Sequence, residues 1–418
     1  MKHDFNTYGK SLTKCHFCSG PSLRRVLDLG KQPHSDDFVE QERLEQAEVF
    51  FPLKLVSCGD CGLLQINYYV NPDILYRTNY VYESSITKTG VAHYEEMSKS
   101  ISDRFKFPES SLVVDIGSNV GVLLNGFKKN GHSVLGVDPA KKVAKKAIEN
   151  GIPTIIDFFN EEVADEILAN YNPVSIVTGT NVFAHLHDVH SAMRGIKKIL
   201  ASDGVLVIEA PYALEMIEKN EYDTIYHQHI GYLAVKPMQQ FFTEYDMDLF
   251  DIEYKTIHGG TIRYFVGHKD SHRVSDSIEK YISKEEEFGL YDEVRLEQFR
   301  AGVELQRSQL QTLLLGLKMD GKKIVGVSAP AKGNTLLNYC GLDSSILDFT
   351  TERSQLKIGK YTPGSSIPIV SDDELLRVQP DYALILAWNF AEEIMKNLDD
   401  YKKAGGKFII PIPYPIII

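Results

Sequence analysis

The chain has 418 residues, of which 43% are hydrophobic and 24% are charged, and its net charge is −12. This composition is ordinary for a globular protein of two or three domains. The negative charge argues against broad binding to nucleic acid or a membrane surface, because both need a basic footprint. The sequence shows no signal peptide and no apolar run long enough to span a bilayer, so we expect a cytoplasmic protein.

The first feature along the chain is a set of two Cys-x-x-Cys pairs. The four cysteines are Cys15, Cys18, Cys58 and Cys61. Each pair can present two thiolates to one metal ion, so together they predict a tetrahedral zinc site in a module spanning residues 1–70. Four ligands fill the shell, and the zinc should therefore be structural. Two chance pairs or two disulfides are the alternatives, as is replacement of one thiolate by His16. A reducing compartment fits all the thiols, including the unpartnered Cys340.

Strand and helix patterns alternate after a tyrosine-rich link. The expected strands are 112–116, 134–138, 174–178 and 205–209, and the expected helices are 122–129 and a lysine-bearing helix that ends at Asn150. Alternation of this kind predicts a parallel sheet covered by helices. We therefore expect an α/β core over residues 71–275.

Two further regions follow the core. Residues 276–320 are charged and carry apolar residues at helical spacing, which predicts one or two long connecting helices. Strand-length apolar runs at 324–327 and 382–386 indicate a second α/β domain over residues 321–418. The apolar tail after Phe408 is interrupted by prolines, and we expect a final strand with an irregular end.

A glycine turn follows the first expected strand of the core, where Gly117-Ser118-Asn119-Val120-Gly121 comes after Asp115. Its spacing is neither the dinucleotide G-x-G-x-x-G nor a Walker loop, although a dinucleotide-binding fold is the rival. The segment resembles motif I of class I S-adenosylmethionine-dependent methyltransferases. The resemblance implies that the turn approaches the methionine moiety of the cofactor and that Asp115 helps to hold its amino group.

Later positions fit the same cofactor. Asp138 ends the next expected strand, where an acceptor-only carboxylate can receive both ribose hydroxyls. Asp157 and Phe158 fit the position where an acid meets the adenine amine and an aromatic ring covers the base, and Asn181 falls where that family lines the pocket. The residues assigned to the cofactor are Asp115, Gly117, Ser118, Asn119, Gly121, Asp138, Asp157, Phe158 and Asn181.

The densest group of titratable side chains is Tyr226-His227-Gln228-His229, with Tyr222 just before it. It follows the expected strand 205–209, on the carboxyl-end side where α/β sheets bind ligands. Histidine titrates near neutrality and can remove a proton. Metal ligation by the two histidines and a polar cluster at a helix start are the alternatives.

Taken together, nearly all 418 residues resemble the sugar C-methyltransferases that act on nucleotide-linked 4-keto-deoxyhexoses. The resemblance is carried by the four cysteines, the glycine turn and the segments 181–185, 226–229, 329–334 and 357–364. It implies a class I methyltransferase core with a Rossmann-like fold, an N-terminal zinc module and a C-terminal Rossmann-like domain that holds the nucleotide sugar. It also implies a monomer.

The family pattern at the histidines is Tyr-His-Glu-His, whereas this chain has Gln228 in place of the glutamate. The resemblance implies that His229 is the base, while Gln228 can bond a sugar oxygen but cannot take a proton. Tyr80, Tyr82 and Tyr226 are expected to donate hydrogen bonds to an enolate oxygen. A packed aromatic hinge is the alternative for the tyrosine-rich link.

The C-terminal domain should hold the nucleotide diphosphate. Lys332 lies in an expected strand-to-helix turn, where backbone amides and a cation suit an anion, although a merely solvated lysine is the alternative. Arg353 and Lys357 add positive charge. The residues assigned to the sugar nucleotide are Tyr222, His227, Lys332, Asn334, Arg353, Lys357 and Tyr361.

We therefore expect an enzyme that transfers a methyl group from S-adenosylmethionine to C3 of a dTDP-linked 4-keto-6-deoxyhexose, in branched deoxysugar biosynthesis. A 4-ketone acidifies the proton on C3, and no catalytic metal is required. One alternative is methyl transfer to another ring carbon or to a sugar oxygen or nitrogen. The other is a nucleotide-sugar-binding protein without activity.

Overall fold

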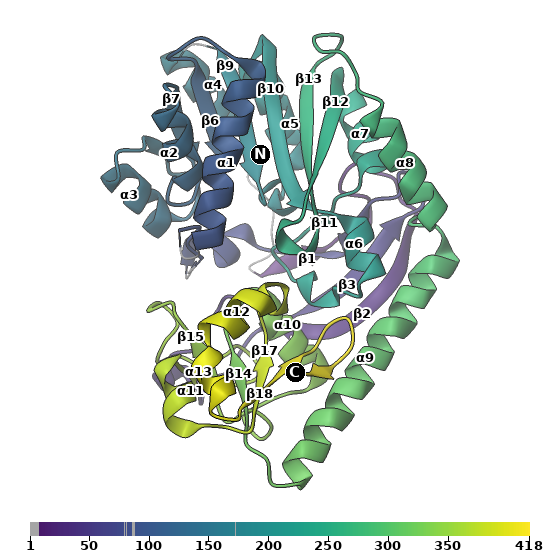
Figure 1. The fold of residues 1–418 in the computed structure, drawn as a ribbon. Helices are drawn as coiled ribbons and strands as arrows, with labels where there is room; N and C mark the ends of the chain where they lie inside the picture. Colours follow the sequence, from purple (N-terminus) through teal and green to yellow (C-terminus); the bar gives the residue numbers. More distant parts are fainter. Residues whose placement is uncertain (1–7, 79, 81, 86–87, 172) are drawn as a thin grey trace.

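The structure is a computed structural model that describes residues 8–78, 80, 82–85, 88–171 and 173–418. The core sheet, which has seven strands, and its helices form the upper part of the molecule in Figure 1, and the C-terminal sheet forms the lower part. Strands β2 and β3 of the N-terminal module lie between them, and helix α9 runs down one side from the upper part to the lower part (Figure 1).

The N-terminal module is an antiparallel sheet that takes one strand from the core. Its strands are β1 (Gly9–Ser11), β2 (Leu23–Pro33), β3 (Phe50–Cys58), β4 (Leu64–Ile66) and β5 (Tyr68–Val70). Strand β11 (Gly231–Tyr232), which follows the histidine segment, pairs with β4 in the order β11-β4-β3-β2, while β1 pairs with β5. This pairing joins the module to the residues next to His229.

The core sheet has the order β12-β13-β10-β9-β6-β7-β8, in which β10 to β8 are parallel and β12 and β13 are antiparallel. Its strands are β6 (Leu112–Ile116), β7 (Ser133–Val137), β8 (Thr154–Ile155), β9 (Val174–Thr180), β10 (Leu200–Pro211), β12 (Met247–Lys255) and β13 (Thr261–His268). All five residues of β6 are buried, as in a strand covered on both faces. The expected strand 112–116 and helix 122–129 coincide with β6 and α2.

Helices of the core connect and cover these strands. They are α1 (Lys88–Phe105), α2 (Val122–Lys129), α3 (Lys141–Glu149), α4 (Glu161–Asn170), α5 (Val189–Ile199), α6 (Ala213–Glu218) and α7 (Val235–Thr243). Short turns of other helical types also occur: η1 (Gln41–Arg43), η2 (Asp73–Thr78), η3 (Phe183–His185), η4 (Tyr222–Thr224), η5 (Ile257–Gly259) and η6 (Trp388–Phe390).

Two helices connect the core to the C-terminal domain, namely α8 (Ser277–Phe288) and α9 (Glu293–Met319). The buried side chains of α9 include Leu296, Phe299 and Val303, at the spacing of one helix face. The C-terminal domain contains β14 (Ile324–Val327), α10 (Ala331–Cys340), β15 (Thr350–Glu352), β16 (Ile369–Ser371), α11 (Asp373–Val378), β17 (Tyr382–Ile385), α12 (Ala391–Asn397), α13 (Asp399–Lys403), β18 (Lys407–Ile410) and β19 (Ile416–Ile417).

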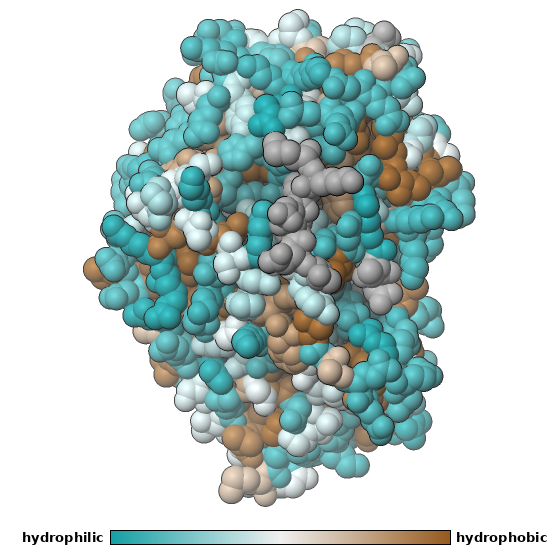
Figure 2. Space-filling view, turned by 180° about the vertical axis from the view of Figure 1, so that it is seen from behind, coloured by the Kyte–Doolittle hydropathy of each residue, from teal (hydrophilic) through white to brown (hydrophobic). Residues whose placement is uncertain are grey.

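The C-terminal sheet has the order β16-β15-β14-β17-β18-β19, parallel except for the last strand. One hydrophobic cluster runs through all three parts of the molecule and includes Leu55, Ile208 and Leu336. The face seen from behind in Figure 2 is mostly hydrophilic. Among the described residues, no helix combines the length and the apolar character needed to cross a bilayer.

Candidate active site

A cavity of about 1220 Å³ lies where the module, the core and the C-terminal domain meet. Its lining comes from the loop after β2, the tyrosine-rich link, the carboxyl ends of the core strands, the histidine segment and the C-terminal domain. Pockets for one small molecule usually occupy about 300–1,000 Å³. The cavity is therefore large enough for two substrates side by side.

The glycine turn forms one wall of this cavity. Gly117 has φ +71°, and a Cβ atom there would lie 2.6 Å from the Val182 side chain, so the turn requires glycine. Asp115 lies buried behind the turn and accepts a hydrogen bond from the Thr178 hydroxyl at 2.6 Å. Burial raises the pKa of Asp115 to about 7. A cationic ligand group next to this carboxyl would favour its ionised form.

Asp138 fixes the shape of the same turn. Its two carboxylate oxygens accept backbone N–H groups from Asn119 and Ala140, each at 2.8 Å. Burial raises the pKa of Asp138 to about 6. Each oxygen keeps a further lone pair, so the carboxylate is still suited to accept ribose hydroxyls. Gly121, at φ +80°, is the N-cap residue of helix α2 and is not part of the cavity lining.

The far end of the cofactor wall contains an arginine that the sequence analysis missed. Arg77 donates to Asp157 at 2.7 Å, and its guanidinium carbon lies 4.8 Å from the ring centroid of Phe158. All three residues line the cavity, as does Asn181, whose backbone has φ +54°. An acid and an aromatic ring therefore stand together at the expected adenine position. Arg77 comes from η2, about 80 residues before Asp157 in the chain, and no sequence motif marks it.

The histidine segment forms the opposite wall. His229 Nδ1 lies 2.8 Å from the Thr224 carbonyl oxygen, and because a carbonyl only accepts, Nδ1 carries the proton. Nε2 of a neutral imidazole is then an acceptor, and it receives the Tyr226 hydroxyl at 2.7 Å. Burial and the nearby Asp36 raise the pKa of Tyr226 well above its usual value, so this hydroxyl stays protonated. The geometry therefore gives His229 Nε2 the properties of a base.

Four side chains join this pair in the lining. Gln228 donates from Nε2 to Oδ2 of Asp36 at 3.0 Å. The His185 ring lies 4.8 Å from the His229 ring, centroid to centroid, and His185 Nδ1 is 3.2 Å from the Tyr76 hydroxyl. Burial and the neighbouring histidines lower the pKa of His185 well below its usual value. Sequence reasoning assigned no role to Asp36, Tyr76 or His185, although His185 ends a segment that carries the family resemblance.

Tyr80 and Tyr82 also line the cavity, so all the residues assigned to catalysis share it. Tyr80 packs against Tyr76 with ring centroids 5.8 Å apart. The sequence offered two alternatives for the tyrosine-rich link, namely a packed aromatic hinge and a set of hydrogen-bond donors at the active site. In this arrangement the same tyrosines can do both.

Two residues near the histidine segment lie elsewhere. Tyr222 is fully buried outside the cavity, and its hydroxyl donates to Gln306 of α9 at 2.8 Å. His227 is 1% exposed and has Nε2 3.2 Å from the carbonyl oxygen of Pro52 in strand β3. Both side chains hold neighbouring parts of the protein together. Neither side chain lines the cavity, so the cavity geometry gives no support to their assignment to the sugar nucleotide, which stays a prediction.

Three residues of the C-terminal domain are likewise outside the cavity lining. Asn334 is buried and donates to the backbone oxygen of Ser35 at 2.7 Å. Arg353 pairs with Asp372 at 2.9 Å on the surface, and the Tyr361 hydroxyl contacts a side chain of η1. Each side chain is engaged between or within domains, and their contact with the nucleotide stays a prediction that the cavity geometry does not support.

Lys332 and Lys357 do line the cavity and bring positive charge to its C-terminal side. The Lys332 ammonium lies 4.0 Å from the Trp388 ring centroid, near the start of α10. Lys357 Nζ donates to the carbonyl oxygen of Ala329 at 2.8 Å and lies 3.6 Å from a Glu352 oxygen. A partly buried cation beside a helix start is suited to an anionic ligand.

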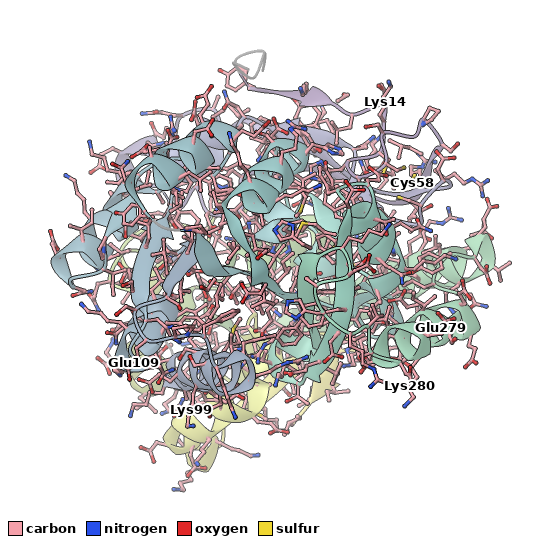
Figure 3. All side chains as sticks on the ribbon, turned by 90° about the horizontal axis from the view of Figure 1, so that it is seen from above. Lys14, Cys58, Lys99, Glu109, Glu279 and Lys280 are labelled. Carbon is pink, nitrogen blue, oxygen red and sulfur yellow. The ribbon has the colours of Figure 1, made fainter. Side chains whose placement is uncertain are left out.

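The four cysteines converge at a separate place. Their sulfur atoms lie within 4.8 Å of one another, with 3.6 Å between Cys15 and Cys61 and between Cys18 and Cys58. A tetrahedron with Zn–S bonds of about 2.3 Å has edges of about 3.8 Å, so this set fits a structural zinc ion with no open position. In Figure 3 the labelled Cys58 lies far from Lys99 of α1.

Comparison with known families covers most of the chain. Residues 15–76 match a family model described as "Putative zinc binding domain", residues 91–250 match "Methyltransferase domain", and residues 256–413 match "C-methyltransferase C-terminal domain". Among solved structures, magnesium protoporphyrin IX methyltransferase from Synechocystis PCC 6803 aligns with a TM-score of 0.35 and 10% identity, covering 45% of this chain and 90% of that chain. An S-adenosylmethionine-dependent methyltransferase from Clostridium acetobutylicum aligns with a TM-score of 0.33 and 7% identity, covering 43% and 92%.

A full-length relative is also known. The C-methyltransferase NovU of Streptomyces niveus is 33% identical over 410 residues, which cover 98% of this chain and 97% of that protein. The match extends through the zinc module, the core and the C-terminal domain. This protein therefore belongs to the family of S-adenosylmethionine-dependent C-methyltransferases.

Proposed function

We propose that this protein transfers a methyl group from S-adenosylmethionine to C3 of a dTDP-linked 4-keto-6-deoxyhexose, through an enolate, in the biosynthesis of a branched deoxysugar. The observation that carries the proposal is that the Tyr226–His229 pair and the turn between Asp115 and Asp138 line one cavity. The proposed base and the glycine turn of the cofactor site therefore face the same space, in which the methyl group would be transferred.

Features of the glycine turn support the assignment of S-adenosylmethionine as the cofactor. When bound, S-adenosylmethionine supplies an electrophilic methyl group on a positively charged sulfur. Gly117 leaves the room that a side chain would fill, and the buried Asp115 has a pKa poised for a cationic partner. Within the described part of the chain, the Ser118 hydroxyl is buried and has no hydrogen-bond partner, so a polar ligand group could satisfy it.

The chemistry needs a base and an acid at the sugar. His229 Nε2 takes the proton from C3, the C–H electron pair forms the C3–C4 double bond, and the ketone oxygen becomes the enolate oxygen. Tyr226, released from Nε2, donates its hydroxyl to that oxygen and stabilises the developing charge. The carbon of the enolate then attacks the methyl group, and the C–S electron pair leaves with sulfur. Thr224 holds the imidazole throughout by accepting from Nδ1.

The nucleotide end of the substrate is assigned to the C-terminal domain. Lys332 and Lys357 line the cavity on that side, and α10 directs its N-terminal end to the same region. Cations and free backbone amides together suit a diphosphate. A reducing, cytoplasmic setting belongs to the proposal, because four thiolates on zinc and the buried Cys340 thiol suit such a setting, and we retain the expectation of a monomer.

Incubation with dTDP-4-keto-6-deoxyglucose in deuterated water tests the proposal. With S-adenosylmethionine, mass spectrometry should find a product in which one carbon-bound hydrogen has been replaced by a methyl group. With S-adenosylhomocysteine instead, the protein should catalyse deuterium exchange next to the ketone. His229→Asn should lose both reactions. A protein that binds the cofactor yet methylates none of a panel of dTDP-linked 4-keto sugars would contradict the proposal.

A second ring position has specific support. A ketone at C4 acidifies the proton on C5 as well as the one on C3, and the family glutamate near the base is Gln228 here. Gln228 lines the cavity near His229, where the side chain can influence which carbon faces the base, and C5 is the alternative carbon. Carbon NMR of the product distinguishes the two, because the methylated carbon loses its hydrogen and can be identified by its neighbours.

A further inference from the structure

The zinc module contributes one side chain to the reacting end of the cavity, and that side chain is Asp36. It lies in the loop after β2, is 6% exposed and lines the cavity. Its Oδ2 accepts a hydrogen bond from Gln228 Nε2 at 3.0 Å. A buried carboxylate in an enzyme cavity needs a partner, and this one is bonded to the residue that departs from the family pattern.

The charge of Asp36 acts on the hydroxyl groups around it. After burial itself, Asp36 is the largest influence that raises the pKa of Tyr226 and the pKa of Tyr76. Both tyrosines line the cavity and contact the His229–His185 pair. The Asp36 carboxylate therefore lies close to the side chains proposed to act on the sugar. Asp36 itself belongs to the zinc module, whose metal site is structural.

The loop that carries Asp36 is held on both sides. Before it, the backbone oxygen of Ser35 accepts from Asn334 of the C-terminal domain at 2.7 Å. After it, Asp37 forms an ion pair with Arg43 at 3.1 Å. Asp37 is not part of the cavity lining. Two adjacent aspartates thus have separate positions, one at the cavity and one at the module surface.

Gln228 supplies Asp36 with a hydrogen-bond donor that an ionised glutamate at position 228 could not supply. An amide instead donates to Asp36 and leaves it a pure acceptor. The Asp36 carboxylate has acceptor sites beyond the one that Gln228 uses, so it can accept a hydrogen bond from a donor on the substrate.

We propose that Asp36, positioned by Gln228, is a specificity-determining residue that accepts a hydrogen bond from a hydroxyl or amino group on the sugar ring. The inference rests on the proposed function, since it assumes that a nucleotide-linked sugar occupies this side of the cavity. The zinc module is then part of the sugar site, which gives a reason for its attachment to a methyltransferase core.

Binding of dTDP-linked 4-keto sugars in the presence of S-adenosylhomocysteine tests the inference without turnover. The sugars are the parent 4-keto-6-deoxyglucose compound, its 2-deoxy and 3-deoxy analogues, and its 3-amino analogue. Asp36→Ala should weaken the parent about 10- to 100-fold, as loss of a hydrogen bond to a charged group does. The loss should be about threefold or less for the one analogue that lacks the donor.

Asp36→Asn and Asp37→Asn are the matched variants. Asp36→Asn keeps the shape and should repeat the selective loss, whereas Asp37→Asn should bind every sugar like the wild type. Unchanged binding of S-adenosylhomocysteine establishes that each variant is folded. A larger loss for the amino sugar than for the parent supports the inference and identifies an ammonium as the donor. An equal loss for all sugars, or no loss, overturns it.

The same data separate this inference from the proposed function. If the wild type binds the sugars but transfers no methyl group, the proposed function fails while the selective loss in Asp36→Ala still decides the role of Asp36. If the wild type binds none of these sugars, both fail.

Discussion

The cofactor side and the sugar side of the cavity are built in different ways. The cofactor side comes mainly from strand ends of one sheet, between Asp115 and Asn181, and Arg77 of η2 joins it at its far end. The sugar side is assembled from the module, the link, the histidine segment and the C-terminal domain, including Asp36, His229 and Lys332. The first depends on local backbone geometry, and the second depends on how three parts of the chain dock.

This difference predicts that sugar binding and cofactor binding can be lost independently of each other. The turn at Gly117 is held by hydrogen bonds within the core, above all those to Asp138. The sugar side is held by contacts between parts, such as Asn334 with Ser35 and β11 with β4. A change that loosens the docking should remove sugar binding while the cofactor still binds.

Loss of zinc should have the largest effect. Cys58→Ser, or prolonged chelation, removes a closed metal site that supplies folding energy to the module. We expect complete loss of methyl transfer and of sugar binding, measured by product formation and calorimetry. Binding of S-adenosylhomocysteine should change by no more than about threefold, because the core has its own hydrophobic cluster around Leu124 and Val207. Equal loss of both ligands would contradict the separation of the two sides.

Removal of the proposed base should leave both ligands bound. His229→Asn should lower kcat by about 10³-fold, within the range for general base catalysis, with little change in the affinity for either substrate. His227→Asn is the matched control, because His227 lies outside the cavity against Pro52. It should lower the thermal unfolding temperature and keep kcat. A control that loses kcat as strongly as His229→Asn would overturn the assignment of roles within this segment.

The two sides also differ in what the sequence could predict. Strand β6, the turn and helix α2 are consecutive, so a short window holds the apolar run, the glycines and the acid that define them. Asp138 follows in the same way at the end of the next strand. Backbone geometry over a few residues decides the side-chain directions here, and the structure places Asp115, Gly117 and Asp138 together as expected.

The sugar side carries no such local signal. In the irregular segment from η4 to β11, Tyr226 and His229 line the cavity, whereas Tyr222 and His227 lie in interfaces between parts of the protein. No helical or strand periodicity in the sequence separates the two pairs. Asp36 is a single aspartate in a loop far from the histidines. Its neighbours are set by docking of the module, which depends on packing across about 190 residues of sequence.

A smaller effect is expected from Asp138. Asp138→Ala removes the acceptor for the Asn119 and Ala140 amides and for the ribose, so the affinity for S-adenosylmethionine should fall about 10- to 100-fold. The affinity for the dTDP-linked sugar, measured alone, should stay within about threefold. Calorimetry with each ligand gives both values. A variant that loses the sugar as strongly as the cofactor would show that the two sides are not independent.

The smallest effect is a dependence of cofactor binding on pH. The pKa of Asp115 is raised to about 7 by burial, and a ligand amino group close to it would favour the ionised carboxylate. Below this pKa, binding must first release the proton, so affinity should fall about tenfold from pH 8 to pH 6. The stability of the free protein has the opposite sign, because the folded state binds the proton more tightly than the unfolded state. Its free energy of unfolding should decrease as the pH rises from the unfolded pKa of Asp to about 7.

Calorimetry in buffers of different ionisation enthalpy measures the proton released on binding. Between pH 6 and 7 the wild type should release up to one proton when S-adenosylhomocysteine, which carries the same amino group, binds. Asp115→Asn, which keeps the contact with Thr178 available, should bind more weakly and release none from this site. Proton release that persists in Asp115→Asn would assign the titration to another group, and then Asp138, with a pKa of about 6, is the next to replace. Because both acids belong to the cofactor side, sugar binding to the empty enzyme should not release this proton, which separates the two sides without changing either.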